Sequence, residues 1–224
     1  MTGNQAKPPL WCATWFSNLL AKRRDWFEPS KRYLGERLGR LGLPPSVFTL
    51  SGLLLAGLAA YTYAKTPLGA ALIGTAASLT DFVDGAVARY QKRQSLWGNY
   101  LEAVVDRLVE LTLLLAMAQD LGPVVAWAIA ASMLISYTKP RVAIVINTDN
   151  HDWPGIADHA DRMVILLVSM AAAQWNLKIA QAGIALLTLT AAIGALQRIH
   201  YAYRLIAATE ASPDNTSGQT PQSD

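Results

Sequence analysis

Four acidic side chains lie close together in an otherwise strongly apolar part of the chain: Asp81, Asp84, Glu102 and Asp106. The first two are three residues apart and the last two are four apart, so each pair shares one face of a helix. Only a short polar connection, residues 90–97, separates the two helices, which predicts that they are antiparallel neighbours. We therefore expect the four carboxylates to converge on one point at the edge of the apolar region.

Such a cluster needs positive charge, because even one ionised group inside a membrane costs several kcal/mol. Mg²⁺ and Mn²⁺ prefer oxygen ligands, and two such ions about 4 Å apart can clamp a diphosphate during phosphoryl transfer. Small residues at Gly85, Ala88 and Gly98 leave space beside the acids for a flat base or a diphosphate. Two other interpretations stay open. The acids could line a proton path, or they could pair with the neighbouring arginines Arg89, Arg93 and Arg107.

The elements that must position these acids are long apolar blocks. Charged residues make up 16% of the 224 positions, whereas about a quarter of a soluble domain is charged. Each block is about long enough for the ~20 residues that a membrane-spanning helix needs, and the fifth has the shortest apolar part. We expect an all-α integral membrane fold with six transmembrane helices. The six predicted helices cover residues 47–64, 68–90, 99–118, 122–146, 160–175 and 178–206.

The distribution of basic residues predicts how these helices are oriented. Of the 19 Lys and Arg residues, only Lys65 and Lys178 lie in the connections after the first and fifth helices. The other seventeen lie in the terminal segments, in the remaining connections or at adjoining helix ends. We therefore expect a multi-pass protein of the cell membrane with both termini, and the chemistry, on the cytoplasmic side.

The segment before the first predicted helix has a different composition. Residues 11–43 alternate aromatic and leucine residues with arginine and lysine, which is typical of an amphipathic helix in the membrane interface, here with a break near Pro29. A basic segment with only a topological role is the alternative. The chain is thus expected to comprise an interfacial segment at 1–43, a six-helix membrane domain at 44–208 and a polar, disordered tail at 209–224.

The acids and their neighbours resemble the signature of the CDP-alcohol phosphotransferase family, DxxDG(x)2AR(x)8GxxxDxxxD. This chain has DFVDGAVAR over residues 81–89 and GNYLEAVVD over residues 98–106, with eight residues between them. One fixed position departs, because Glu102 stands where the family usually has aspartate. Six spans preceded by a juxtamembrane amphipathic helix also look like this family.

The resemblance implies a transferase that moves a phosphatidyl or archaetidyl group from a CDP-linked lipid to an alcohol and releases CMP. Two divalent ions, Mg²⁺ or Mn²⁺, would be held by Asp81, Asp84, Glu102 and Asp106. Asp106 would also act as the general base that takes the proton of the acceptor hydroxyl. The CDP moiety would lie against Gly85, Ala88, Arg89 and Gly98. The family further suggests a homodimer surrounded by membrane lipids, and we expect no nucleic-acid partner.

Basic side chains near the cytoplasmic ends of the last three predicted helices could recognise a phosphate on the acceptor. They are Lys139, Arg141, His159, Arg162 and Arg198. The surrounding segments, SYTKPR at 136–141 and DHADR at 158–162, look most like the phosphatidylinositol-phosphate and archaetidylinositol-phosphate synthase branch, which implies inositol phosphate as the acceptor. His159 stands where that branch has arginine. Glycerol phosphate, serine or another alcohol, and ordinary flanking charge for these residues, stay open.

Two hypotheses from other classes also remain. A small membrane transporter with an acidic cavity would have a similar hydropathy profile. However, the sequence shows no inverted repeat, and the function of a transporter does not explain why glycine, alanine and arginine are spaced in this way among the acids. A catalytically silent scaffold that retains the site is the third hypothesis, given the departures at Glu102 and His159.

Overall fold

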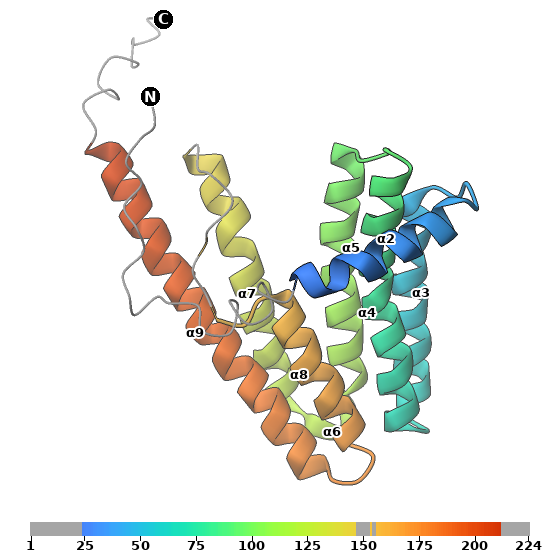
Figure 1. The fold of residues 1–224 in the computed structure, drawn as a ribbon. Helices are drawn as coiled ribbons and strands as arrows, with labels where there is room; N and C mark the ends of the chain where they lie inside the picture. The colour runs from blue at the N-terminus through green and yellow to red at the C-terminus, as the bar shows by residue number, and fades with distance from the viewer. Residues whose placement is uncertain (1–23, 147–152, 154–155, 212–224) are drawn as a thin grey trace, which may run out of the picture.

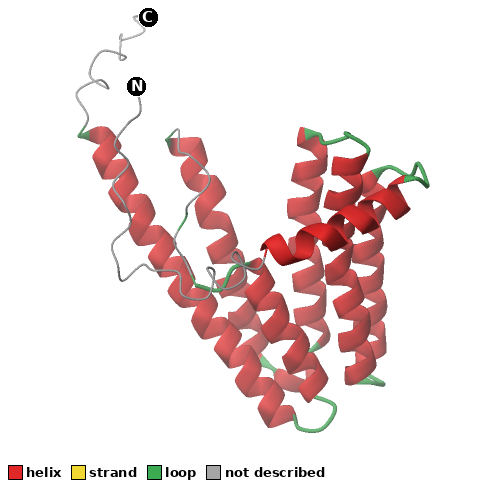
Figure 2. Ribbon diagram, in the orientation of Figure 1, coloured by secondary structure: helices red, strands yellow, loops and turns green. Residues whose placement is uncertain are grey.

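The computed structural model describes residues 24–146, 153 and 156–211, and within these ranges every regular element is a helix (Figures 1 and 2). The helices are α2 Arg24–Gly39, α3 Pro45–Tyr63, α4 Pro67–Tyr90, α5 Leu96–Ala116, α6 Ala118–Leu121, α7 Pro123–Val145, α8 His159–Ala172 and α9 Leu177–Glu210. The predicted all-α fold is confirmed for this part of the chain. All helices except α2 and α6 match the six predicted segments, to within four residues at every end.

Local sequence explains where these helices begin. Proline occupies a first-turn position of α3, α4 and α7, where its missing N–H costs nothing and its fixed φ suits a helix. Ser95 is the N-cap of α5, and its hydroxyl accepts a hydrogen bond of 3.0 Å from the Gly98 N–H. Gly122 separates α6 from α7 with a φ of +62°, a conformation that favours glycine.

Three of the described helices are long and apolar enough to cross a membrane: α3, α4 and α9. The 14 residues of α8 extend only about 21 Å, against the roughly 30 Å of a hydrocarbon core. The sequence of α5 includes the charged residues Glu102, Asp106, Arg107 and Glu110. Length and composition therefore identify three of the six predicted spans.

The helices form two groups (Figure 1). α3 packs against α4 and α5 on one side, α7 packs against α9 on the other, and α8 contacts both α4 and α9 and so joins the two groups. Small residues allow close approach: a Cβ added at Gly74 would lie 2.8 Å from the Leu167 side chain of α8, and one at Gly52 would collide with Thr80 of α4. The buried core between the groups includes Leu113, Leu114, Leu166, Met170 and Ile184.

The helix α2 lies across the first group and packs against α4 (Figure 1). A Cβ at Gly35 would lie 2.7 Å from the Ala86 carbonyl oxygen, and Gln91 Nε2 donates hydrogen bonds of 3.0 Å to the carbonyl oxygens of Gly39 and Leu43. These contacts fix the corner between α2 and α3.

The structure corrects two predictions for the terminal segments, and other parts of these segments lie outside the described residues. α2 continues through Pro29, so the predicted break there is wrong. Pro29 lies within the first two turns of the described helix, where proline removes a single helical hydrogen bond. Helix α9 continues to Glu210, two residues into the predicted tail. Residues 1–23 of the predicted interfacial segment and residues 212–224 of the predicted tail lie outside the described residues.

Candidate functional site

Three carboxylates meet between α4 and α5. Asp81, Asp84 and Glu102 each place an oxygen within 4.8 Å of the other two. Thr49 of α3 donates a hydrogen bond to Asp84 Oδ2, while Asp84 Oδ1 and Asp81 Oδ1 are buried without a hydrogen-bond partner. Buried carboxylate oxygens that lack partners are costly unless a cation binds them. The Glu102 side chain, despite its extra methylene relative to aspartate, reaches the same cluster.

No arginine forms an ion pair with this cluster in the described part of the chain. The ion pairs found there join none of the three acids to Arg89, Arg93 or Arg107. Arg107 lies near Glu110, Asp106 and Asp81, yet its Nη1 is buried without a partner. A set of carboxylate oxygens with no soft donor fits a hard divalent cation such as Mg²⁺ or Mn²⁺.

Asp106 lies beside this cluster and is not one of the three acids whose oxygens group together. It follows Glu102 by one helical turn, or about 6 Å along α5. There its Oδ2 lies 3.9 Å from Nε2 of His159, which begins α8. The expected convergence of four carboxylates is therefore a group of three with a neighbouring Asp106–His159 pair.

Two cavities meet at the carboxylates. The larger one, about 670 Å³, is bordered by the α2–α3 corner, the end of α4 and the start of α5. The residues predicted to contact CDP all line it, together with two of the acids: Gly85, Ala88, Arg89, Gly98, Asp84 and Glu102. A Cβ added at Gly85 would have a single neighbour within 4 Å, Arg89 Nη1 at 3.8 Å, so this glycine leaves open space in the cavity.

The smaller cavity, about 260 Å³, lies among α4, α5 and α8. Its polar lining includes Asp81, Asp84, Asp106 and His159, and the rest is largely apolar, with Val109, Met163 and Leu167 among the contributors. Thr49 and Asp84 line both cavities. A ligand that occupies the two cavities together must therefore pass Asp84, with a polar part on the side of Arg89 and an apolar part on the side of Met163.

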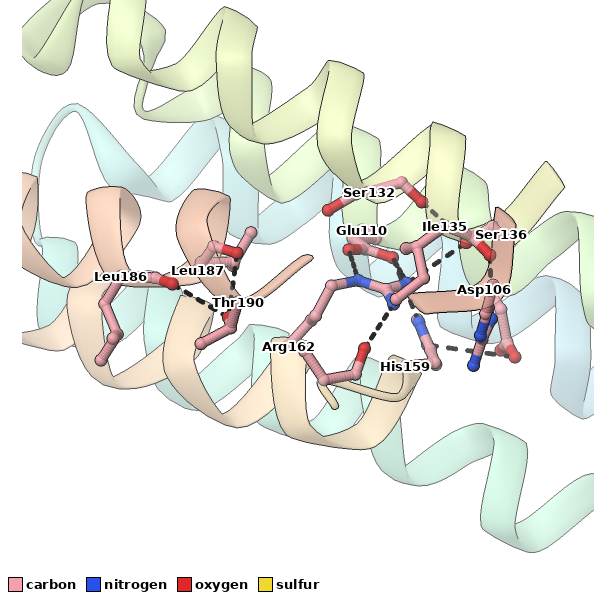
Figure 3. A network of polar contacts seen from close by, with 12 residues as sticks. Asp106, Glu110, Ser132, Ile135, Ser136, His159, Arg162, Leu186, Leu187 and Thr190 are labelled. Carbon is pink, nitrogen blue, oxygen red and sulfur yellow. Dashed lines mark hydrogen bonds and ion pairs between the residues drawn. The ribbon is translucent and has the colours of Figure 1, made fainter. Parts of the chain in front are cut away.

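A buried ion pair between Arg162 and Glu110 lies next to His159 and holds it in place (Figure 3). Arg162 and Glu110 are 1% and 0% exposed, and Arg162 donates to both carboxylate oxygens, at 2.7 Å from Nε and 2.9 Å from Nη2. The guanidinium also donates to the Ala157 carbonyl oxygen at 3.0 Å and to Ser136 Oγ at 3.3 Å. Glu110 Oε2 lies 3.1 Å from His159 Nδ1, so the pair fixes the imidazole ring facing Asp106.

The basic residues predicted to bind an acceptor phosphate do not form one cluster. His159 faces Asp106 in the smaller cavity. The exposed Arg141 lies near the end of α7, whereas Lys139 is half-buried and lies near Arg198. Arg198 Nη1 donates to the Ile135 carbonyl oxygen at 2.8 Å, and its Nη2 contacts Asp158 Oδ1 at 2.7 Å. The prediction for Arg162 needs correction, because its guanidinium is buried and already bound to Glu110.

Three residues at the site were not among the predicted ones: Thr49, Glu110 and Asp158. Glu110 had a visible signal, because Gly98, Glu102, Asp106 and Glu110 recur every four residues and so share one face of α5. A buried acid on an apolar helix also requires a partner. The contacts of Thr49 with Asp84 and of Asp158 with Arg198 join residues far apart in the chain, and no local pattern indicates them.

Comparison with known proteins places the chain among enzymes of phospholipid synthesis. The sequence model described as CDP-alcohol phosphatidyltransferase matches residues 43–208. The chain is 28% identical over 157 residues to the archaetidylinositol phosphate synthase of Pyrococcus horikoshii, covering 67% of this chain and 81% of that protein. It is also 28% identical over 205 residues to the phosphatidylinositol phosphate synthase of Mycolicibacterium smegmatis, covering 82% and 88%.

The fold is similar to that of a Mycobacterium tuberculosis phosphatidylinositol phosphate synthase. The crystal structure with CDP-DAG bound gives a TM-score of 0.69 at 22% identity, covering 85% of this chain and 98% of that one. The crystal structure in complex with manganese and citrate gives a TM-score of 0.68 at 23% identity, covering 77% and 88%. At these identities the similarity establishes the fold.

Proposed function

The chain belongs to the CDP-alcohol phosphatidyltransferase family, and we propose that it transfers a phosphatidyl or archaetidyl group from a CDP-linked lipid to inositol phosphate. The observation that carries this proposal is the meeting at Asp84 of two cavities, the larger one lined by Arg89 and Arg93 and the smaller one largely apolar, beside a group of three carboxylates. A CDP-linked lipid has the matching shape, with a nucleotide on one side of a diphosphate and a lipid on the other. The names of the relatives support inositol phosphate as the acceptor.

The nucleotide lies in the larger cavity. Gly85, Ala88 and Gly98 line that cavity without bulky side chains, and Arg89 supplies a positive charge next to Gly85. The diphosphate then lies beside Asp84, where the two cavities meet. The bound CDP-DAG in the structure of the M. tuberculosis enzyme supports a substrate of this class.

Asp81, Asp84 and Glu102, with Asp106 beside them, hold two divalent ions, Mg²⁺ or Mn²⁺. The unpaired buried oxygens of Asp81 and Asp84 and the manganese in the M. tuberculosis enzyme structure support this assignment. Bound ions neutralise the diphosphate and the charge that develops on the departing CMP.

Asp106 is the general base. It takes the proton of the acceptor hydroxyl, whose oxygen forms a bond to the phosphorus that carries the lipid. The anhydride bond to the CMP phosphate breaks, and CMP leaves with the bonding electrons. The position of Asp106, in the smaller cavity next to Asp81 and Asp84, supports this role. His159, fixed by Glu110, lies next to Asp106 in the same cavity and borders the acceptor.

The membrane arrangement follows from the same family. Helices α3, α4, α5, α7, α8 and α9 make up six spans within a membrane domain at residues 44–208, with the shorter α8 and the charged α5 shielded by their neighbours. Residues 1–43, including α2, form the interfacial segment, and the residues after α9, which ends at Glu210, form the tail. Both termini are cytoplasmic in the cell membrane, and the protein is a homodimer surrounded by lipid. The separation of Lys65 and Lys178 from the other basic residues supports this orientation.

A panel of acceptors tests the proposed function. The purified chain in vesicles that contain CDP-diacylglycerol is supplied with inositol phosphate, glycerol phosphate, serine or inositol, and released CMP and the lipid product are measured. We expect kcat/KM for inositol phosphate to exceed that for inositol or serine by about 100-fold or more, since a site built for a phosphate rejects analogues that leave its charges unpaired. It should also exceed that for glycerol phosphate, which carries the phosphate but not the inositol ring. A higher kcat/KM with another acceptor would reassign the acceptor.

A further inference from the structure

The guanidinium of Arg198 on α9 has a hydrogen-bond donor without a partner. Arg198 is held in place by its Nη1 hydrogen bond to the Ile135 carbonyl oxygen, and its side chain is 12% exposed. An arginine usually binds a carboxylate or phosphate through two nitrogens at once. Here the Asp158 carboxylate contacts Nη2 at 2.7 Å, while Nε is buried and has no partner. The ion pair therefore leaves one donor of the guanidinium unsatisfied.

Asp158, the aspartate of this ion pair, does not use its side chain to cap α8. Asp158 is the N-cap of α8, where aspartate usually accepts a hydrogen bond from the second or third residue of the helix, but its side chain makes no capping hydrogen bond. Asp161 is the third residue of α8, the position of the acidic partner in a capping box, and lies near the Asp158 backbone. The part of the capping box that depends on the Asp158 carboxylate is open.

The backbone around Asp158 is fixed, so only its side chain needs to turn. The Ile156 N–H donates to Gln197 Oε1 at 3.1 Å, and the Ala157 carbonyl oxygen accepts from the buried Arg162. Ala157 itself has a φ of +64°, which an alanine keeps only when its surroundings hold it. The Asp158 side chain is 52% exposed and can rotate between Arg198 and the start of α8.

We propose that Asp158 occupies the place of the acceptor's phosphate on Arg198 while the acceptor is absent. This inference rests on the proposed function. An incoming phosphate has more charge than one carboxylate and can satisfy both Nε and Nη2, with Lys139 close by to add attraction. Once displaced, the Asp158 carboxylate caps α8. An alcohol without a phosphate cannot displace Asp158, so this residue determines specificity for phosphorylated acceptors.

Asp158→Asn tests the inference, because it removes the charge and keeps the shape of the side chain. We expect the KM for inositol phosphate to fall about two- to fivefold, the range expected for the loss of one partly exposed competing ion pair. The kcat should stay unchanged, and inorganic phosphate should become a stronger competitive inhibitor by a similar factor. Asp161→Asn is the matched control: it alters the same helical turn without contacting Arg198 and should leave the KM unchanged.

An unchanged or raised KM in folded Asp158→Asn would overturn the inference, since a raised KM would mean that Asp158 positions Arg198 for the substrate. Stabilisation of the detergent-solubilised protein by inorganic phosphate, measured as the shift in unfolding temperature, gives a readout without turnover. Asp158→Asn should show the larger shift at low phosphate, and an equal or smaller shift would also overturn the inference. Lack of CMP release by the unaltered chain with inositol phosphate would instead refute the proposed function, and the phosphate-binding comparison would still decide the role of Asp158.

Discussion

Asp84→Asn is expected to lower CMP release by about 100-fold or more while the protein remains folded. Asp84 is the one acid of the group that lines both cavities, and one of its oxygens is buried without a partner. Asparagine keeps an oxygen that can accept the hydrogen bond from Thr49 but removes the negative charge. The cluster then binds divalent cations less strongly, and the diphosphate loses its neutralising charge at the point where the anhydride bond breaks.

CMP release at saturating CDP-diacylglycerol and inositol phosphate measures this effect. Asp120→Asn is a suitable control, because Asp120 is an exposed acid on α6 that lines neither cavity. The control should retain the full rate. If Asp84→Asn kept its activity within about tenfold of the original rate, the assignment of Asp84 to the reaction centre would be wrong.

Arg162→Met is expected to lower the free energy of unfolding by about 3–5 kcal/mol, as is typical when one partner of a buried ion pair is removed. The substitution leaves Glu110 fully buried without its two hydrogen bonds from the guanidinium. It also removes the hydrogen bonds to Ala157 and Ser136 that fix the segment before α8. Activity should fall as well, because His159 loses the rigid support behind its imidazole.

Denaturant unfolding in detergent micelles measures the change, and a double-mutant cycle separates its causes. Adding Glu110→Gln to Arg162→Met removes the uncompensated charge and should restore a large part of the lost stability. The exposed Arg141 provides the control, since Arg141→Met should change stability by less than about 0.5 kcal/mol. Equal stability of Arg162→Met and the original chain would show that the pair does not hold α5 and α8 together.

Local signals in the sequence located the helices well. Proline in the first turns of α3, α4 and α7 and the Ser95 cap of α5 act within a few residues, so the pattern along the chain contains them. The spacing of the acids is also a local signal, and it predicted that Asp81, Asp84 and Glu102 lie together. The family assignment, which rested on these residues and on the glycine and alanine between them, is confirmed, and it excludes the transporter hypothesis.

Contacts between distant segments account for what the sequence did not predict. Positive charge alone cannot distinguish an arginine that binds a substrate from one that neutralises a buried acid, and Arg162 pairs with Glu110, 52 positions earlier. The pairing of Asp106 with His159 joins α5 to α8, 53 positions later, and no local pattern indicates it. The continuity of α2 through Pro29 was also mispredicted, because proline lowers helix propensity without determining where a helix ends.

Removal of divalent cations tests the central claim most directly. The purified chain is placed in vesicles with CDP-diacylglycerol and inositol phosphate, and CMP release is followed before chelation, after chelation and after Mg²⁺ or Mn²⁺ is restored. We expect release to stop on chelation, to return with the added ion, and to require inositol phosphate throughout. Release that continues in the presence of the chelator, or no release when both the ion and the acceptor are present, would contradict a metal-dependent transferase centred on Asp81, Asp84 and Glu102.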